Sequence, residues 1–156
     1  MIEYRRERLI HASPEAIWPV VADPIRLPEW FVGIESVRML NGGDPELGRH
    51  AIEGPWGEQR FEIVRALDQV TEGSRIVWRD EYETLDGMAP SDPWHAGSWF
   101  EITLEDGEGG TAVTITGRQR PASPEWRGRL LSAARATGER LESSLAQLAG
   151  LVERGG

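Results

Sequence analysis

Residues 122–154, ASPEWRGRLLSAARATGERLESSLAQLAGLVER, have the pattern of one long amphipathic helix. Ser123 is a residue type that caps helices, Pro124 suits the first helical position, and Glu125 complements the positive end of the helix dipole. We predict one continuous helix to about Arg154, roughly 45 Å long at 1.5 Å per residue. Spacings of three and four place a set of side chains on one stripe of this helix: Leu130, Ala134, Thr137, Leu141, Leu145, Leu148 and Val152.

The residues before this helix alternate between apolar and polar types and are divided by turn residues, a pattern typical of antiparallel strands. In residues 98–105, Phe100, Ile102 and Leu104 alternate with polar or larger neighbours, and the glycine-rich turn 106–110 predicts a hairpin into the next strand. In residues 75–82, Ile76, Trp78 and Tyr82 share a parity and are predicted to lie on one face of the sheet. A further turn is predicted at 41–44. The predicted strands are 4–10, 34–40, 48–53, 60–67, 75–82, 98–105 and 111–118.

Two short helices are predicted between the first and second strands. Ser13 and Pro14 mark the start of the first helix, which carries Ile17 and Trp18 and stops at residues 23–24, an Asp-Pro step. That step begins a second short turn, which ends near Pro28 because proline cannot continue a helix.

This order of elements resembles the START-like superfamily, which includes polyketide cyclases and dehydrases. The residues most specific to the resemblance are 12–18 (ASPEAIW), 23–24 (DP) with 27–30 (LPEW), and 109–114 (GGTAVT). The resemblance implies an α+β helix-grip fold: a curved seven-stranded antiparallel sheet around a long C-terminal helix, forming a single domain over residues 1–156. Members of the superfamily bind hydrophobic ligands and include cyclases, lipid carriers, ligand sensors and chaperone activators.

Composition excludes several kinds of function. The chain has no cysteine, so disulfides, thiolate zinc sites and cysteine nucleophiles are absent, and its 17 basic residues are all arginine, so lysine Schiff bases are absent too. The net charge of −9 disfavours nucleic acid and anionic lipid as partners. Three scattered histidines show no metal-ligand spacing. We expect a cytoplasmic monomer or homodimer with no cofactor, no metal and no inserted membrane segment.

A cavity is predicted where the long helix carries small residues. Ala134, Thr137 and Gly138 lie between Leu130 and Leu141, which leaves space opposite them for a ligand; the alternative is that small residues simply allow close packing. We expect the partner to be an apolar or aromatic small molecule. The residues predicted to contact it are Trp30, Trp56, Trp78, Trp99, Phe100, Leu130, Ala134, Thr137 and Leu141.

One end of the sheet is expected to be aromatic. Antiparallel order brings Trp56, Trp94, Trp99 and Trp126 to the same end, either as the mouth of the cavity or as ordinary core aromatics. The long loop 84–97 is predicted to be a lid at that end. It contains His95, which can form an acid–base pair with a carboxylate three residues earlier or simply be solvated.

Four residues are candidates for catalysis: Glu101 as a desolvated general base, Tyr82 as a donor to an enolate oxygen, Arg118 as an anion ligand, and His95. Strand alternation argues against part of this set. If Phe100 faces inward, Glu101 faces outward unless a bulge intervenes. Two functions therefore fit the sequence: a cofactor-independent cyclase or dehydrase acting on a polyketide-like substrate, and a non-catalytic carrier or sensor of a hydrophobic metabolite or lipid.

Overall fold

The computed structural model of the chain describes residues 1–40 and 48–155, so the turn predicted at 41–44 lies outside the described residues. The strands in the described part are β1 (Ile2–Ile10), β2 (Ser36–Met39), β3 (Arg49–Trp56), β4 (Gln59–Thr71), β5 (Arg75–Leu85), β6 (His95–Gly107) and β7 (Gly110–Pro121). The helices are α1 (Pro14–Val21), the 3-10 turn η1 (Pro24–Arg26), α2 (Leu27–Trp30), α3 (Pro124–Ser132) and α4 (Ala134–Gly155).

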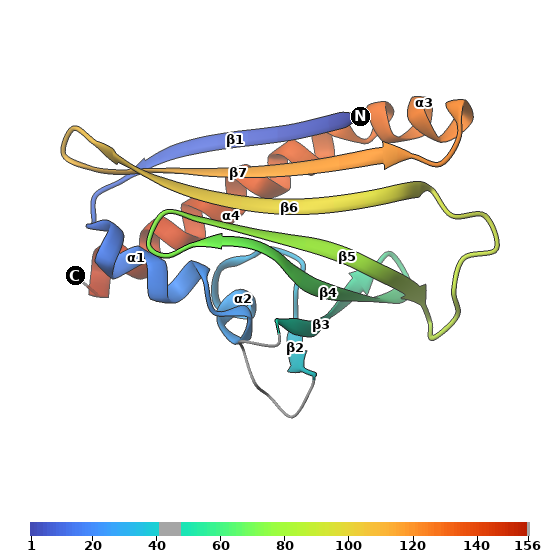
Figure 1. Cartoon of the computed structure of the whole chain (residues 1–156), viewed down its shortest axis with the longest axis horizontal. Coiled ribbons are helices and arrows are strands. Elements are labelled where there is room, and N and C mark those ends of the chain that lie inside the picture. The colour runs from blue at the N-terminus through green and yellow to red at the C-terminus, as the bar shows by residue number, and fades with distance from the viewer. Residues whose placement is uncertain (41–47, 156) are drawn as a thin grey trace.

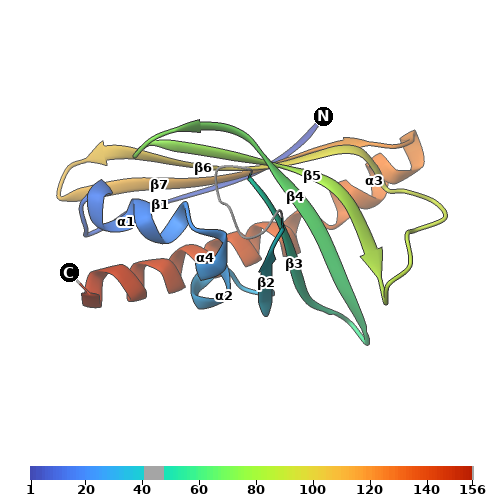
Figure 2. The same cartoon turned by 60° about the horizontal axis from the view of Figure 1, so that its bottom comes forward.

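The strands form one antiparallel sheet in the order β1-β7-β6-β5-β4-β3-β2. Each strand from β2 to β7 pairs with its neighbour in sequence, and β1 closes onto β7. Helix α4 runs along one face of the sheet, and α1 and α2 lie near one end of it (Figure 1, Figure 2). This is the predicted helix-grip α+β fold, including the short helices between β1 and β2.

The sheet has an inner face, toward α4, and an opposite outer face. Ile102 of β6 and Ile115 of β7 are directly paired and fully buried, and they belong to the same core cluster as Leu145 and Leu148 of α4. Phe100 and Leu104 share the strand face of Ile102 and are also buried. The alternation read from residues 98–105 therefore correctly identified the face that α4 covers.

The sequence predicts one continuous C-terminal helix. The structure instead divides it at Ala133 into α3 and α4. There the backbone N–H donates to the carbonyls of both Arg129 and Leu130, the mixed pattern of a turn tightened toward a 3-10 helix. Tyr4 fixes this point from the sheet, because its hydroxyl donates to the carbonyl of Leu130 at 3.1 Å. The stripe is well buried in the second half of α4, whereas Ala134 and Thr137 keep partial solvent exposure.

Both predicted helix caps are confirmed. The Ser13 hydroxyl accepts a hydrogen bond from the backbone N–H of Ala16, and the Ser123 hydroxyl accepts one from that of Trp126. The hairpin between β6 and β7 is also confirmed: Gly107 pairs with Gly110, which leaves a two-residue turn with Gly109 at φ +83°. None of the described helices is long and apolar enough to cross a membrane.

Bulges in two adjacent strands change which side chains face α4. In β5 the pairing passes from Asp80 directly to Tyr82, so Glu81 is an extra residue, and in β6 it passes from Gly97 to His95, so Ala96 is extra. One extra residue reverses the alternation beyond it. The sequence pattern assigned Tyr82 to the same face as Ile76 and Trp78. The bulge makes that assignment wrong, and Tyr82 lies 54% exposed on the outer face.

The close approach of β3 to the segment after α2 gives a stability prediction. A Cβ added to Gly54 would lie 2.0 Å from the carbonyl oxygen of Gly33 and 2.9 Å from the ring of Phe61. Gly54→Ala should therefore lower the free energy of unfolding by roughly 1–3 kcal/mol, since backbone cannot easily move aside. The measurement is urea unfolding.

Gly128 provides the matched control. It lies in α3, is exposed, and an added Cβ there meets nothing within 4 Å. Gly128→Ala should raise stability by about 0.5–1 kcal/mol through helix propensity alone. Equal effects of the two substitutions would contradict the packing described at Gly54.

Candidate functional site

A row of polar side chains crosses the inner face of the sheet from β3 to β5. His50 is directly paired with Arg65, and Arg65 with Asp80, so the three side chains share one face. Arg65 Nε donates to Asp80 Oδ1 at 2.9 Å, with side chains only 10% and 7% exposed. The Arg65 guanidinium also lies over the ring of Phe100, 4.9 Å from its centroid. The ion pair is thus fixed among apolar neighbours, where charges interact strongly.

His50 forms the first position of this row and is fully buried. Its ring packs edge-on against Trp78 with centroids 4.6 Å apart. Burial, together with the positive charge of Arg65, lowers the pKa of His50 from its ordinary 6.5 to about 3, so the imidazole is neutral at physiological pH. Neither ring nitrogen has a hydrogen-bond partner among residues 1–40 and 48–155.

A second polar group lies where β5 ends and β6 begins. His95 Nε2 pairs with Glu83 Oε1, and Trp94 Nε1 donates to Glu83 Oε2 at 2.9 Å. The bulges at Glu81 and Ala96 aim Glu83 and His95 at the inner face, because Glu83 pairs with Ile63 and His95 with Pro121. Both side chains are 13% exposed.

The environment of His95 stabilises its charged form. Burial alone would lower the pKa of His95, but the hydrogen bond to Glu83 and the negative charges of Glu83 and Asp80 outweigh burial and raise the pKa above its ordinary 6.5. Asp80, the partner of Arg65, therefore also acts on His95 through its negative charge. The sequence paired His95 with Asp92, whereas the structure pairs it with Glu83.

The inner face is not closed at this end of the molecule. Several apolar side chains that pack against the core keep partial solvent exposure here, which leaves an apolar surface beside the polar row within reach of solvent. They are Phe31, Phe61, Ile63, Trp94 and Ala134.

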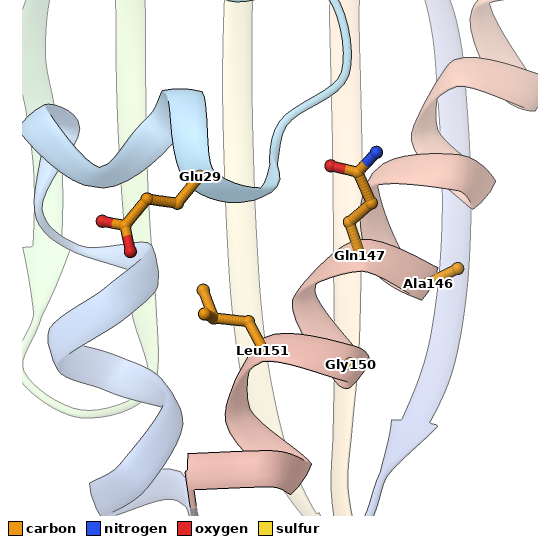
Figure 3. Close-up of a pocket in the computed structure, with 5 residues that line it drawn as sticks. All are labelled: Glu29, Ala146, Gln147, Gly150 and Leu151. Carbon is orange, nitrogen blue, oxygen red and sulfur yellow. The ribbon is translucent and has the colours of Figure 1, made fainter.

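The described residues form hollows on the surface. One of about 410 Å³ lies between α2 and α4, lined by Glu29, Ala146, Gln147, Gly150 and Leu151 (Figure 3). Residues lining another, of about 210 Å³, include Glu53, Phe61 and Thr84. Neither lies opposite Ala134 and Thr137, where the sequence predicts the cavity.

At Gly138 the structure agrees with the alternative of close packing. A Cβ added there would lie 2.2 Å from the guanidinium of Arg6, whose Nε donates to Glu142 at 2.8 Å. The absence of a side chain at Gly138 therefore admits Arg6 from β1, so close packing is the role of this glycine.

The four predicted catalytic residues do not form one site, although two of them are in contact. Glu101 and Arg118 lie on the outer face, where the Glu101 carboxylate is held between Arg75 and Arg118. Burial would raise the pKa of Glu101, but the hydrogen bonds from the two arginines outweigh it and hold that pKa below its usual range. This is opposite to the raised pKa suggested for a general base. Tyr82 is also on the outer face, and only His95 faces inward.

The predicted ligand contacts divide in the same way. Trp30 is fully buried beside Phe31, and Trp56 is half exposed at the end of β3, near Arg140 of α4. Trp99 lies on the outer face under Arg120. The others lie between the sheet and the C-terminal helices: Trp78, Phe100, Leu130, Ala134, Thr137 and Leu141.

The sequence made two predictions for this end of the sheet, a long loop at residues 84–97 and a cluster of tryptophans. The strands extend further than expected, so the connection between β5 and β6 is 86–94 rather than 84–97. Its last residue, Trp94, accepts a hydrogen bond from the backbone of Ala122, which ties the loop to the start of α3. The end of β3, the start of β6 and the start of α3, which carry or adjoin the four tryptophans, lie toward one end of the sheet (Figure 2). Trp99 lies on the outer face under Arg120, whereas Trp94 donates to Glu83, which faces inward, so the four do not share one face.

Sequence reasoning missed His50, Arg65 and Glu83. The one available signal was at His50, which shares strand parity with the buried Ile52. The remaining contacts depend on cross-strand register and on the two bulges. No group of three or more potential metal ligands occurs in the part of the chain that the structure describes.

Opposite pKa shifts at His50 and His95 give a prediction of stability against pH. The folded protein excludes the proton that unfolded His50 binds below pH 6.5, so acid should destabilise the fold by up to about 1.4 kcal/mol per pH unit through this residue. His95 has the opposite sign: its stabilisation is present below 6.5 and is lost as pH rises through its raised folded pKa.

Urea unfolding over a range of pH tests both signs. His50→Gln should make the free energy of unfolding less sensitive to acid than in the wild type, and His95→Gln should make it less sensitive to rising pH above about 6.5. His11→Gln, at an exposed histidine, is the control. Curves that run parallel for all variants would rule out the described environments.

Comparisons with known proteins agree with this fold. The chain is 18% identical to a START superfamily protein from Mycobacterium smegmatis, covering 99% of both chains with a TM-score of 0.72. The protein XoxI from Bacillus cereus is 18% identical, with 97% of this chain and 96% of that chain covered and a TM-score of 0.73. DynU16, from the dynemicin biosynthetic locus, is 19% identical with a TM-score of 0.61; the match covers 98% of this chain but 48% of DynU16.

No curated protein matches the chain. A family model does match: the model described as polyketide cyclase / dehydrase and lipid transport aligns with residues 1–153. This span includes every strand, the short helices, α3 and nearly all of α4. The START-like resemblance of the sequence is confirmed, and the chain belongs to the polyketide cyclase / dehydrase and lipid transport family.

Proposed function

We propose that the chain binds an apolar or aromatic small molecule between the inner face of the sheet and α4, and acts on it as a cofactor-independent cyclase or dehydrase. Family membership supports a hydrophobic ligand. The observation that carries the catalytic part is the pair of histidines with opposite pKa shifts on the inner face, linked through Arg65 and Asp80. Perturbed titratable groups beside an accessible apolar surface are typical of reaction sites.

The polar side chains of the inner face, Arg65, Glu83 and His95, have properties that ring closure and loss of water require. An aldol-type closure needs a base that removes a proton next to a carbonyl, for which the Glu83 carboxylate is placed, and an acid that protonates the oxygen. His95, whose charged form is favoured by the Glu83 carboxylate, is suited to donate a proton to a hydroxyl that leaves as water. Arg65 is suited to stabilise negative charge on an enolate oxygen.

The apolar walls would fold and orient the substrate. Trp78 and Phe100 supply flat surfaces on the sheet, and Leu130 and Leu141 face them from the helices. Orientation alone contributes a large part of the rate in such reactions, so few polar groups are needed. In this proposal Glu101, Arg118 and Trp99 support the sheet from the outer face and do not contact the ligand.

The second candidate is a non-catalytic carrier or sensor of a hydrophobic metabolite or lipid. The observation in its favour is that the charged side chains of the inner face are already paired within the chain: Arg65 with Asp80, and His95 with Glu83. Such pairs can stabilise one conformation of a site without taking part in chemistry. Both candidates use the same apolar surface, so binding and turnover must be tested separately.

Binding is tested by placing a bulky side chain on α4 at the proposed ligand site. Ala134 packs against the core with partial exposure, whereas Ala136 is exposed on α4. Native mass spectrometry of the purified protein should detect a co-purifying small molecule that is released on unfolding. Ala134→Trp should lower its occupancy at least about 10-fold, because an indole occupies the space of the ligand. Ala136→Trp should not change it; equal occupancy in both variants would reject the site.

Turnover is tested with a linear β-polyketone, by following aromatic absorbance above the spontaneous rate of ring formation. His95→Gln should lower kcat about 10²–10⁴-fold while the dissociation constant changes little, because the proton donor is lost and the walls remain. Glu101→Gln, on the outer face, is the control and should leave kcat unchanged. A wild type that binds the polyketone without accelerating ring formation would favour the carrier instead.

A further inference from the structure

His50 is the one polar side chain of the row that lacks a partner. It is 0% exposed, and neither Nδ1 nor Nε2 meets a donor or acceptor in the described residues. The neighbouring cation does not serve it: guanidinium cannot accept the imidazole N–H, and no donor of Arg65 is bonded to a His50 ring nitrogen. Buried groups of this kind are nearly always hydrogen-bonded, since leaving them unpaired is unfavourable.

The state of His50 limits which partners fit. A neutral imidazole offers one N–H donor and one nitrogen acceptor. A hydroxyl group can both donate and accept, so it pairs with either nitrogen, whereas a carbonyl oxygen pairs only with the N–H. Trp78 packs edge-on against the imidazole, so a ligand that reaches His50 also meets an aromatic side chain.

The inner face near His50 has a partly exposed apolar residue. Ile63 lies two residues before Arg65 on β4, pairs with Ile52 and Glu83, and keeps partial solvent exposure. On the inner face of β4, the partly exposed Ile63 is therefore the neighbour of Arg65. His50 of β3 is paired directly with Arg65.

We propose that His50 is a specificity-determining residue that selects ring compounds carrying a hydroxyl group, such as phenols, over the same rings without one. The proposal rests on the proposed function, because it concerns the same apolar site, and it narrows the ligand class from apolar molecules in general to hydroxylated rings. His50 does not need to take part in proton transfer for this role.

The test compares 2-naphthol with naphthalene, two probes with the same ring system, by NMR titration of the isotope-labelled protein. The wild type should bind 2-naphthol about 10-fold more tightly than naphthalene, the effect of one hydrogen bond that satisfies a buried group. His50→Phe should bind both probes with similar affinity, and His50→Gln, which keeps a donor and an acceptor, should retain part of the preference. Tyr82→Phe, which removes an exposed hydroxyl on the outer face, is the control.

A measurement on the wild type keeps the proposal testable if His50→Phe does not fold. The imidazole ¹⁵N signals of His50 should shift on addition of 2-naphthol and not of naphthalene. Unchanged signals would mean that only a buried water serves His50, and equal affinities for the two probes would likewise overturn its role while the apolar site stands. If neither probe binds, the proposed function fails together with this inference.

Discussion

The packing of α4 against the centre of the sheet is the constraint on which the other features depend. Leu145 and Leu148 share a core with Ile102 and Ile115, and all four side chains are almost completely buried. Once this contact is made, one face of every strand is committed to the interior. The first half of α4, with Ala134 and Thr137, covers the same face less completely. Dense packing at one end and partial exposure at the other therefore follow from a single helix seated on a curved sheet.

Much of the fold could be predicted because its determinants are local. Ser13 and Ser123 cap the next turn of their own helices, and the hairpin after Gly107 needs only its own residues. The division of the C-terminal helix at Ala133 was not visible, since nothing in the local sequence breaks the helix there. It coincides with the hydroxyl of Tyr4, which is 126 residues away from Leu130 and binds its carbonyl. Long-range contacts of this kind leave no periodic signal.

The candidate site was less predictable for the same reason. Alternation correctly turned Glu101 away from α4, but a period-two pattern cannot locate a bulge, so Tyr82 was assigned to the wrong face. His95 was recognised, but its partner Glu83 is 12 residues earlier and reaches it only because both strands are irregular. His50 and Arg65 are unremarkable in sequence. They become a unit through the register of β3 with β4, which is a property of the folded sheet.

The two extra residues in β5 and β6 determine which mutations would change the side chains on the inner face. Glu81 and Ala96 each add one unpaired residue to a strand, and this extra residue turns Glu83 and His95 inward. The chemical nature of the Glu81 and Ala96 side chains matters less. Substituting either residue keeps the number of residues in the strand, so the neighbouring side chains keep their orientation. Deleting one would reverse the alternation at the strand end and turn the side chain of Glu83 or His95 to the outer face. An insertion or deletion of one residue at these points would therefore change the inner face more than a substitution of Glu81 or Ala96.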